Sequence, residues 1–367
     1  MTSPIHVHGE AEKPQQSHCG SVASSRQPPQ NRVHQPIWLC EIVIGGIVGN
    51  GGFSEVLQAK SLSSLPVENV CPSTELLFYE PLDKELSIDG PKGAEQSFVI
   101  KRLRHETLFN NQMRGVGIAD LFEEAKVLAS LPRHDNIVTL HGVSPGYWNL
   151  QPSMRDNGFL LLEQVDQTLD QCLDTVRSPK STRSRASIFR PNRRRKAILE
   201  SQDLRIRDFA LGIAKALRFV HKNGYVYRDL KPANVGVTYC DGRPIVKLLD
   251  FGLARRCSEW DTGIPGNDSA GTARYMAPEV ANEQDHGLAC DVHSFAMVMF
   301  EILTLQKPYA NAVTKKFIYE LMVTDKCRPN LHRIQSYVVR DLLSASWHPN
   351  PRLRPTFDSI LVALEAL

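Results

Sequence analysis

The sequence predicts an α+β protein with two lobes, a smaller strand-rich lobe followed by a larger helical one. Short β-branched and aromatic segments dominate up to about residue 163, and amphipathic patterns at helical spacing dominate after residue 168. The 367 residues are 42% hydrophobic and 23% charged, which is typical of globular proteins of about two domains. We therefore expect a first lobe at about 36–163 and a second lobe at about 168–367.

The first lobe is predicted to combine short strands with one long helix. A glycine cluster at 49–52 separates the first two strand segments. Residues 118–130 place Leu121, Glu124, Ala125 and Leu128 on one face at helical spacing, so we expect a helix that buries this face. The strand segments, rich in β-branched and aromatic residues, are 37–44, 56–59, 97–103, 137–143 and 159–162.

The second lobe is predicted to be mainly helical. Residues 203–221 place seven apolar side chains, from Ile206 to Val220, at steps of three and four, which predicts an amphipathic helix. The pair Asp241–Gly242 is typical of a tight turn between two strands, and the second strand ends at Asp250. From Asp291 onward the pattern is helical, with a terminal helix that ends at Leu367.

Three segments differ in composition from the rest. Residues 1–35 are rich in Ser, Gln, Pro and His, so we expect a disordered tail. Residues 61–97 are rich in Ser, Pro and Asp and predict a long loop insertion, with a strand at 76–79 left open. Residues 177–196 contain nine Lys or Arg and no Asp or Glu, which predicts a solvated basic insertion. Three alternatives remain for this basic segment: a docking patch, a localisation patch, or a phosphorylation site at 183–187.

Composition and charge exclude several classes of partner. The chain has 43 Lys and Arg against 40 Asp and Glu, and this near balance argues against nucleic acid as the main partner. No apolar stretch approaches the roughly 20 residues that a membrane-spanning helix needs, so we expect no membrane segment. The eight cysteines are scattered without a C-x-x-C pair, which favours a reduced intracellular setting.

The first residues predict no targeting segment. They lack a charged region followed by an apolar one, so we expect no secretory signal. Glu10 and Glu12 disfavour an organelle transit peptide. We therefore expect a cytoplasmic protein, with the nucleus as the alternative.

Two features of the first lobe suit a phosphate ligand. Glycines at 49–52 let backbone N–H groups approach a polyphosphate, although a Gly-rich turn alone is more often a simple hairpin. Lys101 lies on the third strand and could neutralise phosphate oxygens. Glu124 is its expected partner, because it shares the inward helical face with Leu128, whereas its neighbour Glu123 does not.

The decisive pattern is a series of motifs in a fixed order. Tyr227–Asn234 reads Y-R-D-L-K-P-A-N, Asp250–Gly252 reads D-F-G, and Ala277–Glu279 reads A-P-E. Together with the glycine cluster and the strand lysine, this order resembles the eukaryotic protein kinase family. The resemblance covers about residues 37–367. It implies the bilobal protein kinase fold, with ATP and Mg²⁺ as the cofactors and a protein as the substrate.

Further segments refine the resemblance. Gly271–Glu279 is similar to the G-T-x-x-Y-M-A-P-E run of serine/threonine kinases, and Lys231 within R-D-L-K-P-x-N points to the same type. Asp291–Val298 resembles the D-V-x-S-F-G helix. The segment from Trp347 to Phe357 is similar to the W-x-x-x-P-x-x-R-P-T-F ending of the tyrosine-kinase-like group.

The resemblance implies a role for each site residue. Asp229 would orient the substrate hydroxyl and accept its proton, and Lys231 would contact the γ-phosphate. Lys101, paired with Glu124, would hold the α- and β-phosphates. Asn234 and Asp250 would bind Mg²⁺ through hard oxygen atoms. The other nucleotide-binding residues would be Gly49, Asn50, Gly51, Gly52, Phe53, Ser54 and Val56 of the loop, and the backbone of Glu163 and Val165 beside the gatekeeper Leu162.

Two departures from the family pattern leave alternatives open. Ser54 replaces the third loop glycine, and Tyr227 replaces the His of H-R-D. We expect Tyr227 to pack under Phe251 and to bond backbone near Asp250, as the usual residue does. A pseudokinase that acts as a binding module is the main alternative to an active enzyme. A small-molecule kinase and a tyrosine or dual-specificity kinase are less favoured, because of the A-P-E segment and Lys231.

Control of activity is predicted to centre on Arg228. A guanidinium beside the catalytic carboxylate needs an anionic partner in the activation segment between Asp250 and Glu279. A phosphate added by an upstream kinase would supply one, with Ser269 favoured and Thr262 second. The alternative is that Glu259 or Asp268 already pairs with Arg228. The resemblance gives Thr272 a structural role near Asp229 and Lys231.

Overall fold

The computed structural model describes residues 42–62, 97–144, 158–177, 202–268, 270–324 and 326–367. The predicted tail at 1–35, the start of the strand at 37–44 and the alternative strand at 76–79 lie outside the described residues. Most of the 61–97 insertion and the 177–196 basic insertion lie outside them as well.

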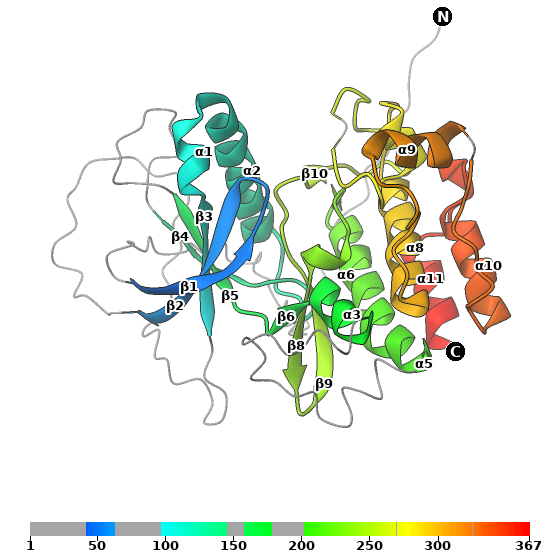
Figure 1. Cartoon of the computed structure of the whole chain (residues 1–367), viewed down its shortest axis with the longest axis horizontal. Helices are drawn as coiled ribbons and strands as arrows, with labels where there is room; N and C mark the ends of the chain where they lie inside the picture. Colours follow the sequence, from blue (N-terminus) through cyan, green and yellow to red (C-terminus); the bar gives the residue numbers. More distant parts are fainter. Residues whose placement is uncertain (1–41, 63–96, 145–157, 178–201, 269, 325) are drawn as a thin grey trace, which may run out of the picture.

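A five-stranded antiparallel sheet forms the first lobe, in the order β1-β2-β3-β5-β4 (Figure 1). The α+β prediction with a strand-rich first lobe is confirmed, but several strand boundaries differ, and β2 extends beyond the predicted 56–59 at both ends. β1 continues through Gly49, because it pairs with β2 as far as Asn50, so that only Gly51 to Phe53 form the turn. Ile137 pairs with Leu248 of the other lobe instead of extending β4. The strands are β1 (Ile42–Asn50), β2 (Ser54–Leu62), β3 (Phe98–Leu103), β4 (Leu140–Val143) and β5 (Phe159–Glu163).

Two consecutive helices, α1 (His105–Phe109) and α2 (Asn111–Ser130), complete this lobe. The predicted helix at 118–130 is present, but α2 begins seven residues earlier, where Asn110 accepts hydrogen bonds from Gln112 N and Met113 N at 3.1 Å each. The sequence concealed this start because two glycines in the first turns weaken helical propensity. Gly117 is needed there, since a Cβ atom would lie only 2.8 Å from the Leu103 side chain.

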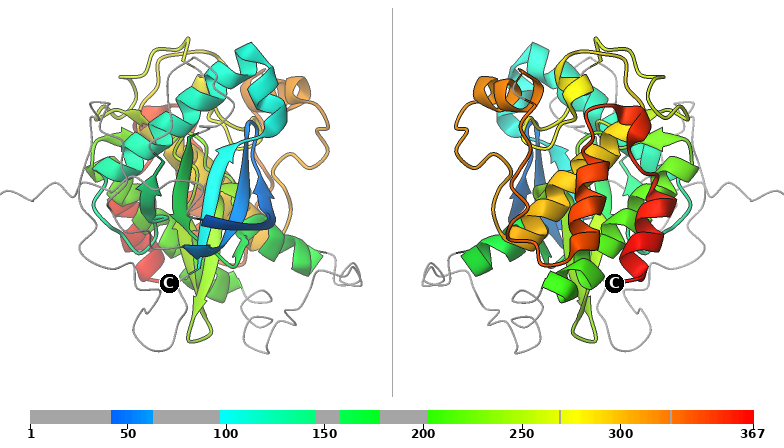
Figure 2. Two further views of the ribbon diagram at one scale, coloured as in Figure 1. Left: turned by 90° about the vertical axis from the view of Figure 1, so that its left-hand side faces the viewer. Right: turned by 90° about the vertical axis from the view of Figure 1, so that its right-hand side faces the viewer.

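The second lobe is built around α8 (Ala289–Thr304), in which every residue is buried. α10 (Tyr337–Ser346) packs against both α8 and α11 (Phe357–Glu365) (Figure 2). The predicted helix at 203–221 is confirmed, although it contains one π-helical turn, and the seven apolar side chains that it was expected to bury are buried. It comprises α5 (Gln202–Arg205), the π turn Ile206–Ala210 and α6 (Leu211–Lys222). The remaining helices are α3 (Leu169–Arg177), α7 (Pro278–Ala281) and α9 (Lys315–Tyr319), with a second π turn at Glu320–Thr324 and a 3-10 turn at Pro351–Leu353.

Small strands flank the motif residues. β8 (Val235–Cys240) and β9 (Arg243–Leu248) form the predicted hairpin, with positive φ angles at Asp241 (49°) and Gly242 (75°) in its two-residue turn. β6 (Gln167–Thr168) joins this hairpin as a third strand, and β7 (Tyr225–Val226) pairs with β10 (Arg255–Arg256). A 3-10 turn at Pro232–Asn234 lies between β7 and β8. The hairpin therefore leads the chain from Asn234 back to Asp250.

A buried ion pair fixes the end of the activation segment. Arg354 donates from Nη1 and Nη2 to the two carboxylate oxygens of Glu279, at 2.6 Å and 2.8 Å. Such a two-pronged contact is the strongest geometry for this pair. None of the helices in the described residues is both long and apolar enough to cross a membrane.

Candidate active site

The carboxylate of Asp229 accepts hydrogen bonds from three neighbouring side chains. Its partners are Lys231 Nζ at 2.6 Å, Thr272 Oγ1 at 2.7 Å and Asn234 Nδ2 at 2.9 Å. Asp229 is 7% exposed, so the carboxylate is held nearly dry and in one orientation. Thr272 contacts both Asp229 and Lys231, and its Oγ1 lies 3.1 Å from Lys231 Nζ. The sequence predicted that Thr272 would lie near these two residues.

Asp291 holds the strained loop that carries Asp229. Arg228 has a φ angle of 75°, which is unfavourable for a residue with a side chain. The fully buried carboxylate of Asp291, in the first turn of α8, accepts the N–H groups of Tyr227 and Arg228 at 2.8 Å each. His221 Nε2 lies 2.8 Å from the same carboxylate. In the sequence, Asp291 stands out only as part of a helix motif, which gives no sign of this support.

Tyr227 occupies a fully buried position between the lobes. Its ring lies edge-on to Phe251 with the centroids 5.1 Å apart, and its hydroxyl donates to the Leu249 carbonyl. Leu128 and Leu140 belong to the same buried cluster. Burial raises the pKa of the Tyr227 hydroxyl well above its ordinary value, so the group stays a neutral donor. The packing and the backbone contact expected for Tyr227 are both present.

Lys101 joins three elements of the site. Its Nζ lies 2.6 Å from Glu124 Oε2 on α2 and 3.0 Å from Asp250 Oδ1 after β9. Burial disfavours the ammonium ion, but the Asp250 and Glu124 carboxylates outweigh it and hold the pKa of Lys101 above its ordinary value. Glu123 instead contacts Lys126, as expected for the outward face of the helix. The lysine is therefore charged and fixed at the junction of the lobes.

Asn234 and Asp250 offer oxygen atoms suited to a divalent cation. Asn234 uses its amide nitrogen on Asp229, which leaves Oδ1 as its ligand atom. The backbone bond from Leu249 N to Asn234 O, at 2.9 Å, ties the residue before Asp250 to Asn234. Burial alone would raise the pKa of Asp250, but Lys101 outweighs it and holds that pKa below its ordinary value. This donor set fits Mg²⁺, which takes one or two carboxylates and completes its shell with phosphates and water.

The glycine-rich turn is anchored to the start of α1. Gly51 N donates to Ser54 O at 2.7 Å, and the Phe53 carbonyl accepts from Arg104 N and from Thr107 Oγ1 at 3.0 Å each. Gly52 faces open space, so its backbone can approach a ligand. Val56 lies opposite Lys101 in the β2–β3 register. Nothing in the local sequence pattern pointed to the anchor on Arg104 and Thr107.

The segment that links the lobes begins at Leu162, the predicted gatekeeper, which is buried. Glu163 N donates to Thr139 O at 3.0 Å, so this N–H does not face a ligand, and the Glu163 side chain pairs with Lys247 at 2.9 Å. Val165 packs on Gly236, where a Cβ atom would lie 2.7 Å from Val165 Cγ1. No backbone hydrogen bond of Val165 is found among the described residues.

The anionic partner of Arg228 is Asp268. Arg228 Nη1 lies 2.8 Å from Asp268 Oδ2, and Nη2 donates to the Asp268 carbonyl. Glu259 instead lies beside Ser258 and Cys257. Ser269, the favoured phosphorylation site, lies outside the described residues.

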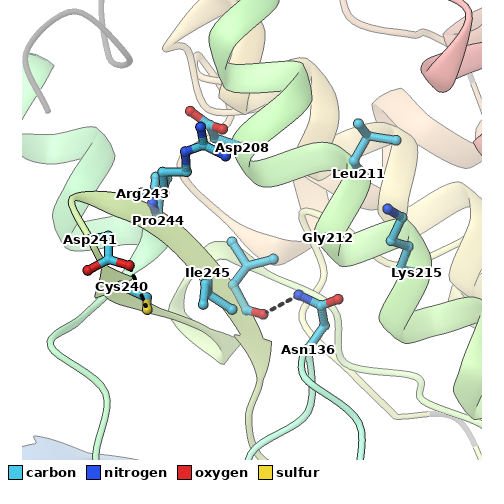
Figure 3. A pocket seen from close by; sticks show the side chains of 11 residues that line it. Asn136, Asp208, Leu211, Gly212, Lys215, Cys240, Asp241, Arg243, Pro244 and Ile245 are labelled. Atoms are coloured by element: carbon cyan, nitrogen blue, oxygen red, sulfur yellow. Dashed lines mark hydrogen bonds between the residues drawn. The ribbon is translucent and has the colours of Figure 1, made fainter. Parts of the chain in front are cut away.

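A separate cavity of about 780 Å³ lies between α6 and the β8–β9 hairpin (Figure 3). Its walls include Leu211, Gly212, Pro244 and Val246, and none of the predicted site residues lines it. The predicted site residues instead contact one another, Lys101 with Asp250 and Asp229 with both Lys231 and Asn234.

Residues 91–363 match the family model described as "Protein kinase domain". The chain belongs to the protein kinase family. The match begins at residue 91, within the insertion, so β1 and β2 lie outside it. The structure nevertheless contains the glycine-rich hairpin of β1 and β2. Because β2 pairs with β3 across the insertion, this hairpin belongs to the same sheet as the matched residues.

Curated relatives of this kinase include three that match about half of the chain. "Probable serine/threonine-protein kinase gdt4" of Dictyostelium discoideum is 35% identical over 168 residues, 45% of this chain and 10% of that protein. "Serine/threonine-protein kinase STY17" of Arabidopsis thaliana is 32% identical over 184 residues, which cover 50% of this chain and 31% of that protein. "Mitogen-activated protein kinase kinase kinase 12" of Rattus norvegicus is 33% identical over 165 residues, which cover 43% of this chain and 17% of that protein. The matched region thus covers less than a third of each relative.

Proposed function

We propose that this kinase transfers the γ-phosphate of ATP to serine or threonine hydroxyls of a protein, with Mg²⁺ as the cation. The observation that carries the proposal is the Asp229 carboxylate, oriented by both Lys231 and Thr272. Lys101, Asn234 and Asp250 complete the set of groups that phosphoryl transfer requires. The serine/threonine names of the relatives support this choice of substrate.

Each group has a defined part in the transfer. The substrate hydroxyl oxygen attacks the γ-phosphorus, the bond from this phosphorus to the β-phosphate oxygen breaks, and Asp229 accepts the hydroxyl proton. The Lys231 ammonium stabilises negative charge on the transferring group, and Lys101 holds the remaining phosphates. Mg²⁺, held by Asn234 and Asp250, would supply further neutralisation of the phosphates. The gatekeeper segment would bind adenine through the Glu163 carbonyl and the Val165 backbone.

A transfer assay tests this function. The full chain is incubated with labelled ATP, Mg²⁺ and a peptide library that presents Ser, Thr or Tyr, beside the Asp250→Ala variant. We expect label on Ser and Thr peptides with the parent and none with the variant. Labelled Tyr peptides would contradict the substrate class. ATP binding without transfer would instead favour a pseudokinase.

A second prediction concerns Tyr227. We expect Tyr227→His to change turnover by no more than a few-fold, because the imidazole would fill the same space beside Phe251. The measurement is kcat with a Ser/Thr peptide, with thermal unfolding as the control for folding. A rise of more than about tenfold, or about 1.4 kcal/mol of barrier, would mean that the native kinase is a weakened enzyme.

We also propose that the kinase belongs to the tyrosine-kinase-like group and acts in the cytoplasm or nucleus. The Trp347–Phe357 ending and the rat relative support the group. The absence of a C-x-x-C pair among the eight cysteines supports a reducing compartment. Fractionation of cells that express the tagged full chain tests the location. Activation by an upstream kinase on Ser269 or Thr262 remains a prediction from the sequence.

A further inference from the structure

Arg228 is a buried arginine that already has a carboxylate partner. The Arg228 side chain is 1% exposed and lies next to the catalytic Asp229 in the chain. Leaving such a guanidinium unpaired would be strongly unfavourable, because its charge is removed from water. Asp268 satisfies it with both a carboxylate oxygen and a main-chain carbonyl. Arg228 Nε has no partner among the described residues, so Asp268 supplies the contacts described for this guanidinium.

Asp268 also reaches the start of the activation segment. Its Oδ2 lies 3.5 Å from Arg255 Nε on β10. Arg255 in turn donates to the carbonyls of Ala254, at 2.9 Å, and Gly252, at 3.3 Å. One carboxylate therefore links the catalytic loop to the residues that follow the predicted metal ligand Asp250. Burial alone would raise the pKa of Asp268, but Arg228 outweighs it and holds that pKa below its ordinary value.

The chain after Asp268 returns to the same arginine. Gly271 has a φ angle of 122°, and a Cβ atom there would lie 2.7 Å from the Arg228 carbonyl oxygen. Thr272 follows and donates to Asp229 at 2.7 Å. Arg228 is thus contacted through its side chain by Asp268 and approached at its backbone by Gly271. The position of Asp268 bears directly on whether Thr272 meets the catalytic carboxylate.

We propose that Asp268 is a positioning residue that holds the activation segment against the catalytic loop, so that the kinase acts without phosphorylation of that segment. The proposal rests on the proposed function and concerns the regulation of the same site. Two arginines converge on this one carboxylate, the arrangement that otherwise binds a phosphate of −1.5 to −2 charges. A single negative charge within hydrogen-bond distance is enough to pair Arg228.

The experiment measures phosphoryl transfer by the full chain before and after phosphatase treatment, with removal of phosphate checked by mass spectrometry. We expect the dephosphorylated parent to keep its kcat. Asp268→Asn should lower kcat about 10- to 100-fold, because it removes the negative charge that pairs with the buried Arg228. Asp268→Glu should recover most of this activity, because it keeps the charge. Asp261→Asn is the matched control, since Asp261 lies in the same segment but pairs with Arg352 on the surface.

Two further readouts separate positioning from a general loss of structure. The thermal midpoints of Asp268→Asn and Asp261→Asn should stay close to that of the parent. The double variant Arg228→Gln with Asp268→Asn should lower kcat no more than the less active of the two single variants. Both substitutions remove the same contact, so their effects do not add. Loss of activity on phosphatase treatment, restored by rephosphorylation, would overturn the proposal in favour of an upstream kinase. Full activity of Asp268→Asn would also overturn it, whereas no transfer by any form would overturn the proposed function itself.

Discussion

Asp229→Asn is expected to lower turnover by about 10²- to 10⁴-fold, the usual contribution of a general base. The amide cannot take the hydroxyl proton, and it loses the charge that draws Lys231 to 2.6 Å. ATP binding should remain close to that of the parent, because Lys101 and Asp250 are untouched. The measurements are kcat with a Ser/Thr peptide and the Kd for ATP by calorimetry.

The matched control for this variant is Asp241→Asn. Asp241 lies in the exposed β8–β9 turn with a φ angle of 49°, which Asn adopts as readily as Asp, so the same chemical change should leave turnover unaltered. Undiminished turnover of Asp229→Asn would contradict the assignment of the base. Weaker ATP binding together with a lower thermal midpoint would instead show that the residue supports the fold.

Glu279→Gln is expected to give the largest loss of stability, about 3–5 kcal/mol in the free energy of unfolding. The Arg354 side chain is fully buried, and the substitution leaves its charge without an anionic partner. Arg354 also donates to the Ala289 carbonyl at 2.9 Å, so the end of the activation segment and the start of α8 should loosen together. Urea unfolding followed by fluorescence measures the change.

Arg352→Gln serves as the control for Glu279→Gln. Arg352 lies two residues before Arg354 and also forms an ion pair, with Asp261, but its side chain is 74% exposed. Water and salt screen such a pair, so its loss should leave the unfolding midpoint nearly unchanged. Equal destabilisation by the two substitutions would mean that burial does not decide the strength of the Glu279–Arg354 pair.

The sequence predicted the fold class and the contacts of several candidate site residues, because periodicity and turn chemistry are local patterns. Glu124 was chosen over Glu123 from helical spacing alone, and in the structure Glu124 pairs with Lys101. The hairpin turn at Asp241–Gly242 was read from the residue types that tolerate positive φ angles. The family resemblance then placed residues that lie far apart in sequence, such as Asp229 and Asp250, in one site.

Only the tertiary structure revealed which groups support these residues. Asp291 lies more than 60 positions from the two N–H groups that it accepts, and Asp268 lies 40 positions from Arg228. Several acidic residues of the activation segment could have met Arg228, and the choice depends on the path of the chain between Asp250 and Glu279. Periodicity and turn chemistry specify neighbours in sequence, whereas a buried charge is paired by whichever partner the folded backbone brings within reach.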